Sequence, residues 1–212
     1  MSVSGRVKTM MNLISDFSGI RAVVFDLDGT LYDKRRLPAR MIAGEFFRLG
    51  LLAAERNARR TLRGRYFGSE DAFYKAFFAE MAHGHCFTVR QAEEWYNTRY
   101  MPLMVSALQH HYKPAEWVAG TLSALREHDI PAAVCSDYGC VEEKMRALGL
   151  DITDFAFVTS APALGGLKPC REVAAQLIDR LGVPAENVLF VGDRDETDGA
   201  MARAVMAQFK MV

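Results

Sequence analysis

Hydrophobic and polar positions follow an alternating pattern over most of this chain. Residues 20–25 form a continuous apolar, β-branched run that is typical of a buried strand. From Pro114 onward, short apolar runs alternate with segments of helical spacing. Strands are expected at 130–135, 155–159, 187–191 and 208–212, and helices at 116–127, 140–148, 170–181 and 196–206. This alternation predicts an α/β, Rossmann-like, mainly parallel sheet with helices on both faces.

Residues 34–113 interrupt that pattern and contain no convincing strand. Phe73, Phe77 and Met81 repeat at helical spacing, and we expect four or five helices in all. The segment holds 14 Lys and Arg against 7 Asp and Glu, and 13 of the 22 aromatic residues. We interpret it as a small all-helical domain inserted into the α/β domain. Its basic surface is either a solvated face or a lid that attracts an anionic substrate.

The composition excludes several classes of protein. The 212 residues carry 26 Lys and Arg against 26 Asp and Glu, a balance that argues against a general nucleic-acid binder. No apolar run approaches the ~18–20 residues of a membrane span, and the first twenty residues do not resemble a secretory signal. The four cysteines form no CxxC pair and are expected to be reduced thiols. We therefore expect a cytoplasmic monomer or homodimer that binds neither nucleic acid nor membrane.

Polar side chains follow four of the expected strands, either where the strand ends or in the loop after it. They are Asp26, Asp28, Ser136, Lys168, Asp193 and Asp198. Because the carboxyl ends of parallel strands share one edge of a sheet, these residues can meet in one crevice. Several carboxylates together with one lysine require a divalent cation, and all-oxygen ligands favour Mg²⁺.

In these residues the sequence resembles the haloacid dehalogenase (HAD) superfamily, over about residues 20–212. Residues 26–30, Asp-Leu-Asp-Gly-Thr, match the first motif (DxDGT). Ser136 matches the second motif, Lys168 the third, and residues 192–198 the fourth (GDxxxxD). Four motifs in order are far more specific than any one of them. The closest resemblance is to phosphatases of the phosphoglycolate phosphatase type, with a helical cap inserted after the first motif.

The resemblance implies a domain division and a chemistry. Residues 20–33 and 114–212 would form a discontinuous catalytic core, residues 34–113 the helical cap, and residues 1–19 a leader or short helix. Asp26 would attack phosphorus and form an aspartyl-phosphate. Asp28 would act first as general acid and then as general base. Thr30, Ser136 and Lys168 would form the phosphate-binding set.

The resemblance also implies a metal site. Mg²⁺ would be held by the carboxylate of Asp26, the backbone carbonyl of Asp28 and the carboxylate of Asp193. Asp198 would lie behind this set and orient a metal-bound water or Lys168. The expected reaction is Mg²⁺-dependent hydrolysis of a small phosphorylated metabolite, such as phosphoglycolate, a sugar phosphate or a nucleoside monophosphate.

Two other functions stay open. A phosphosugar mutase would use the same acid at Asp28, and a non-catalytic phospholigand-binding protein could keep the fold. Dehalogenating members do not need that acid, so Asp28 favours phosphate esters. Five arginines lie between residues 56 and 65, and they form either a solvated cationic stripe or a clamp for a substrate carboxylate or second phosphate. His83 and His85 alone are a weak indication of metal binding.

Overall fold

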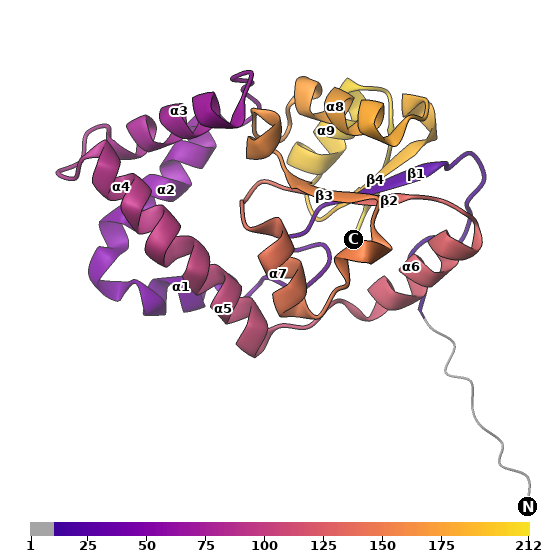
Figure 1. Ribbon diagram of the computed structural model, residues 1–212, viewed down its shortest axis with the longest axis horizontal. Helices are drawn as coiled ribbons and strands as arrows, with labels where there is room; N and C mark the ends of the chain where they lie inside the picture. Colours follow the sequence, from indigo (N-terminus) through magenta and orange to yellow (C-terminus); the bar gives the residue numbers. More distant parts are fainter. Residues whose placement is uncertain (1–10) are drawn as a thin grey trace, which may run out of the picture.

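The computed structural model describes residues 11–212 and contains a five-stranded, fully parallel sheet (Figure 1). The order across the sheet is β3-β2-β1-β4-β5. The strands are β1 (Ala22–Phe25), β2 (Ala132–Ser136), β3 (Phe157–Ser160), β4 (Val188–Gly192) and β5 (Gln208–Met211). The α/β, Rossmann-like prediction is confirmed, and each expected strand lies within two residues of its predicted start.

Helices cover both faces of this sheet. They are α6 (Glu116–Glu127), α7 (Val141–Leu148), α8 (Arg171–Leu181) and α9 (Ala200–Ala204). Val23 and Phe25 of β1 pack in one apolar core with α6 and α7. Ala22 and Val24 face the other way and pack in a second core with α8 and α9. The near-continuous apolar run of β1 follows from this, because a strand covered on both faces has no polar side.

The helix expected at 196–206 is shorter than predicted. Asp195–Gly199 forms a π-helical turn, and α9 begins only at Ala200. A wide turn of this kind changes the direction in which side chains leave the helix, and π-bulges are frequent at functional sites. Periodicity alone cannot distinguish this turn from the α-helix that follows it.

The remaining helices lie between β1 and α6 and form a unit beside the sheet (Figure 1). They are α1 (Leu37–Gly44), α2 (Leu49–Leu62), α3 (Glu70–Ala82), α4 (Val89–Trp95) and α5 (Met101–His111). Phe73, Phe77 and Met81 are fully buried along α3, so their helical spacing does reflect a packed face. We refer to α1–α5 as the helical cap. Residues 34–113 as its limits stay a prediction.

The ends of the chain add little to this picture. Residues 11–19 contain no helix, and the rest of the leader expected at 1–19 lies outside the described residues. Over residues 11–212, no helix is both long and apolar enough to span a membrane.

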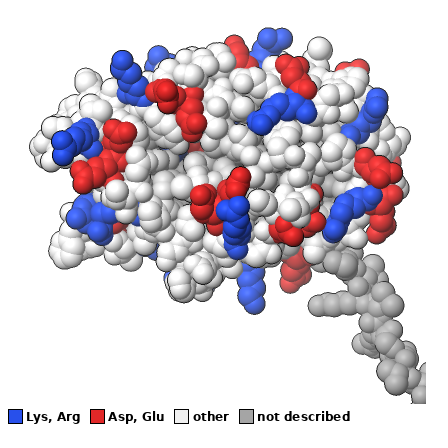
Figure 2. Space-filling view, in the orientation of Figure 1, with Lys and Arg blue, Asp and Glu red and all other residues white. Residues whose placement is uncertain are grey.

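All four cysteines are free thiols. On the face drawn in Figure 2, lysine and arginine lie among aspartate and glutamate, without a continuous patch of one sign.

Candidate active site

Asp26 is the first residue after β1, at the centre of the sheet. Phe25, the last residue of β1, pairs with Val134 of β2 and Val191 of β4, so β2 runs two residues and β4 one residue past the end of β1. One carboxylate oxygen of Asp26 accepts a hydrogen bond from Thr30 Oγ1 at 2.9 Å, and the other lies 2.8 Å from Lys168 Nζ. Burial raises the pKa of Asp26 to about 6, even though the charge of Lys168 opposes that rise. The contacts with Thr30 and Lys168 hold the two carboxylate oxygens in one orientation.

Lys168 connects two carboxylates. Its ammonium group lies 2.8 Å from Asp26 Oδ1 and 2.8 Å from Asp198 Oδ1, and its side chain is 3% exposed. Burial lowers the pKa of Lys168, but Asp26 and Asp198 outweigh that effect and hold the pKa well above its usual value. Gly192 allows this arrangement, because a Cβ there would clash with the side chain of Asp198. Lys168 thus supplies a permanent positive charge beside Asp26.

Asp28 belongs to a different network from Asp26. Its carboxylate accepts hydrogen bonds from Ser136 Oγ at 2.6 Å, Tyr32 Oη at 2.7 Å and Lys144 Nζ at 2.6 Å. Burial raises the pKa of Asp28, but the charge of Lys144 and these hydrogen bonds outweigh burial and lower it overall. In this arrangement Asp28 is an ionised carboxylate with three donors.

Ser136 takes part in the Asp28 network rather than pointing to Lys168. Besides donating to Asp28, its hydroxyl accepts a hydrogen bond from the backbone N–H of Tyr138 at 2.9 Å and lies 3.1 Å from Lys144 Nζ. The structure therefore brings together Asp26, Thr30, Lys168 and Asp198 in one group, and Asp28 and Ser136 in a neighbouring one. Phosphate binding by Ser136 stays a prediction.

Lys144 is a site residue that the sequence analysis did not predict. It lies on α7 between Val141 and Leu148, at helical spacing from both, and its side chain is completely buried. A lysine in the apolar stripe of an amphipathic helix is rare unless it is paired. A lysine among the apolar positions of this helix therefore indicates a buried partner, although it does not lie at the end of a strand.

Carboxylate oxygens of three aspartates could hold a metal ion. Asp26, Asp193 and Asp198 each offer an oxygen, and these atoms lie within 4.8 Å of one another. The other oxygen of Asp193, Oδ1, is buried without a hydrogen-bond partner in the part of the chain that the structure describes. Gly29 has a φ of +105°, and a Cβ there would lie 2.5 Å from Asp193 Oδ2. A set of hard oxygen donors around a tight glycine turn fits a divalent cation.

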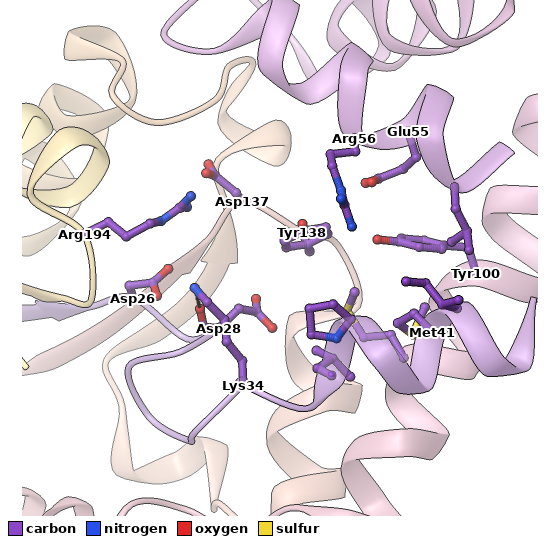
Figure 3. A pocket seen from close by; sticks show the side chains of 15 residues that line it. Asp26, Asp28, Lys34, Met41, Glu55, Arg56, Tyr100, Asp137, Tyr138 and Arg194 are labelled. Carbon is purple, nitrogen blue, oxygen red and sulfur yellow. Dashed lines mark hydrogen bonds between the residues drawn. The ribbon is translucent and has the colours of Figure 1, made fainter. Parts of the chain in front are cut away.

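A cavity of about 500 Å³ opens between these carboxylates and the helical cap (Figure 3). Asp26 and Asp28 line it from the sheet, and Arg194 and Tyr138 line it from the loops after β4 and β2. Helices α1, α2 and α5 supply most of the remaining lining, and Lys34, Tyr100 and Asp137 complete it. The site is thus enclosed from two sides, as a reaction sheltered from water requires.

Comparison with known proteins decides the family. The family model for haloacid dehalogenase-like hydrolases matches residues 20–205. The chain belongs to this family. In this fold the first HAD motif begins directly after β1, and the fourth begins at Gly192, the last residue of β4. No curated protein matches the chain.

Solved structures of other HAD proteins share the fold. The HAD protein YfnB of Bacillus subtilis, solved bound to magnesium, superposes with a TM-score of 0.64 at 15% identity, covering 91% of this chain and 88% of that one. A "predicted phosphoglycolate phosphatase" of Haemophilus somnus 129PT gives 0.60 at 19% identity, covering 90% and 84%. A 2-haloacid dehalogenase of Pseudomonas syringae pv. tomato DC3000 gives 0.61 at 20% identity, covering 90% and 85%. The names of these proteins describe different reactions, so similarity to them establishes only the fold.

Proposed function

We propose that this HAD hydrolase cleaves small phosphate monoesters through an aspartyl-phosphate on Asp26. The observation that carries the proposal is the position of Asp26 at the floor of the cavity, with its carboxylate held by Thr30 and Lys168. A carboxylate in a fixed orientation is a suitable nucleophile for phosphorus. Lys168 offsets the repulsion between this carboxylate and a phosphoryl dianion.

The reaction has two displacements. In the first, an oxygen of Asp26 bonds to phosphorus, the ester P–O bond breaks, and the leaving oxygen takes a proton from Asp28. In the second, Asp28 takes a proton from water, the water oxygen bonds to phosphorus, and the bond to Asp26 breaks to release phosphate. The ionised Asp28 of this structure suits the second displacement. Its role as acid requires substrate binding to change its pairing with Lys144, because that pairing lowers its pKa.

Mg²⁺ is the metal that we propose for the site. The carboxylates of Asp26 and Asp193 and the carbonyl of Asp28 would hold it, while Asp198 positions Lys168. When bound, the ion would neutralise charge on the phosphoryl oxygens. Hard oxygen donors and the magnesium-bound Bacillus subtilis neighbour support this choice.

Asp28 also favours phosphate esters over carbon–halogen bonds. A halide leaves as a stable anion and needs no proton, whereas an alkoxide leaving from phosphorus does. Asp28 lies at the cavity, where its carboxylate accepts hydrogen bonds from Ser136 and Tyr32. A group that can carry a proton at this position therefore supports hydrolysis of a phosphate ester.

The test is phosphate release from a panel of phosphorylated metabolites and 4-nitrophenyl phosphate, with Mg²⁺ or EDTA. We expect metal-dependent release that falls by at least about a thousandfold in Asp26→Asn. Asp179→Asn, an exposed position on α8, is the matched control and should keep full activity. Isomerisation of a phosphosugar with little free phosphate would instead indicate a mutase. Binding of phosphorylated compounds without any turnover would indicate a non-catalytic protein.

A further inference from the structure

Glu55, Tyr100 and Tyr138 line the cavity beyond Asp26 and Asp28, but one wall of it consists of apolar side chains. Those from the cap are Leu37, Pro38, Met41 and Ile42 of α1, Leu52 of α2, and Met104 of α5. A phosphoryl group at Asp26 would leave most of the 500 Å³ for the alcohol part of the ester. A sugar placed against this wall would have hydroxyl groups without hydrogen-bond partners, and unpaired buried hydroxyls are costly. The wall therefore favours an alcohol with an apolar body.

Three of the described cations line the cavity, and Arg56 is the one that comes from a helix of the cap, whereas Lys34 precedes α1 and Arg194 follows β4. Arg56 of α2 lines the cavity and points into it, toward Tyr138 (Figure 3). Within residues 11–212, no hydrogen bond or ion pair involves the guanidinium of Arg56. The next residue back, Glu55, is already paired with Arg59. The charge of Arg56 is thus available to a ligand.

The other arginines of the cluster are engaged differently. Arg59 pairs with Glu55 and donates to the carbonyl oxygen of Asp137 at 2.6 Å. Arg60 is exposed, donates to Asn57 at 3.0 Å and does not line the cavity. Arg63 and Arg65 do not line the cavity either. Of the five arginines that the sequence offered as a clamp for a substrate anion, Arg56 is therefore the candidate that the cavity supports.

We propose that the substrate is a phosphate monoester of an alcohol with an apolar body and an anionic end, and that Arg56 binds this end. The proposal rests on the proposed phosphatase function. Arginine binds carboxylates through two parallel hydrogen bonds, which makes a carboxylate the simplest such end. The anionic ends of the substrate would then meet Lys168 on the core side and Arg56 on the cap side, with the apolar body against α1.

The experiment compares hexyl phosphate with 6-(phosphonooxy)hexanoate, which differ only in the terminal carboxylate. We expect kcat/KM of the native enzyme to be about tenfold higher for the carboxylated ester, as a partly exposed charge-assisted hydrogen bond allows. Arg56→Met should abolish this preference, so that the ratio of kcat/KM for the two esters falls to about one. Arg60→Met, on the same helix but outside the cavity, should keep the preference.

A second variant tests the apolar wall. Ile42 is 42% exposed, so Ile42→Gln should fold normally. We expect kcat/KM for hexyl phosphate to fall about fivefold in this variant, because apolar contact with the alkyl chain is lost. Hydrolysis of glucose 6-phosphate or phosphoglycolate faster than both hexyl esters would overturn the proposal, and so would a carboxylate preference that survives Arg56→Met. Failure to hydrolyse any ester, 4-nitrophenyl phosphate included, would overturn the phosphatase function as well.

Discussion

The ammonium group of Lys34 lies 2.6 Å from Asp193 Oδ2 and 2.5 Å from the carbonyl oxygen of Asp28. Both oxygens belong to the set that we propose for Mg²⁺. Lys34 comes from the segment between the first motif and α1, where the chain leaves the sheet for the cap. An ammonium group and a divalent cation cannot share these oxygens at such distances, so metal binding has to displace Lys34.

Replacing Lys34 should therefore strengthen Mg²⁺ binding. We expect the Kd for Mg²⁺ to fall about fivefold in Lys34→Met, since a partly exposed ion pair is worth up to about 1 kcal/mol. Isothermal titration calorimetry of the substrate-free protein measures this directly. Lys75→Met, an exposed lysine of α3, is the control and should leave the Kd unchanged. Equal Mg²⁺ affinity in Lys34→Met and the native protein would show that the two cations do not compete.

The buried pair of Lys144 and Asp28 gives a prediction about stability. Lys144→Met leaves the Asp28 carboxylate buried without its counter-ion. We expect the free energy of unfolding to fall by about 3 kcal/mol, as for other buried pairs that lose one partner. The double variant Asp28→Asn with Lys144→Met removes both charges and should be more stable than Lys144→Met alone. Urea denaturation of the native protein, the two single variants Asp28→Asn and Lys144→Met, and the double variant measures the coupling. Strictly additive effects would argue against the ion pair.

Arg59 joins the helical cap to the core. Its guanidinium donates to the carbonyl of Asp137 at 2.6 Å and to Tyr96 Oη at 2.9 Å, and it lies 4.0 Å from the centroid of the Tyr138 ring. Asp137 and Tyr138 belong to the loop after β2, whereas Arg59 and Tyr96 belong to the cap. This one side chain therefore contributes contacts on both sides of the cleft.

Loss of Arg59 should loosen the cap. In Arg59→Met we expect faster amide hydrogen exchange in α2 and in the loop after β2, together with about 3 kcal/mol lower stability, because Glu55 stays buried without a partner. Arg59→Met with Glu55→Gln removes that unpaired charge. Exchange that stays fast in the double variant would come from the lost contacts with the core. Native exchange rates in both variants would contradict a connecting role for Arg59.

Much of the fold could be predicted from sequence because burial on both faces leaves a clear signal. Strands β1 and β4 are apolar throughout, and the polar residues that follow them mark one edge of the sheet. This is why Asp26, Lys168 and Asp198 could be placed together although more than a hundred residues separate the first two. The helical insertion was visible from its spacing and its aromatic content.

The missed contacts depend on side-chain direction. Lys144 contacts Asp28 from α7, which packs against the sheet. Lys34 contacts Asp193 beside Gly29, whose positive φ and missing Cβ leave room for both side chains. Ser136 donates its hydrogen bond to Asp28, and the spacing of residues in the sequence cannot predict which of several neighbouring acceptors it contacts. The positions of these side chains follow from the packing of elements that are distant in the sequence. They determine whether the pKa of each carboxylate is raised or lowered.

The proposed reaction requires a covalent phosphoryl group on Asp26. The decisive measurement is acid quenching of the enzyme during turnover of 4-nitrophenyl phosphate with Mg²⁺, followed by proteolysis and mass spectrometry. We predict that the peptide containing Asp26 gains the mass of one phosphoryl group, and that this gain is absent in Asp26→Asn. A phosphoryl group on another residue, or steady turnover with an unmodified Asp26 peptide at every quench time, would contradict the account.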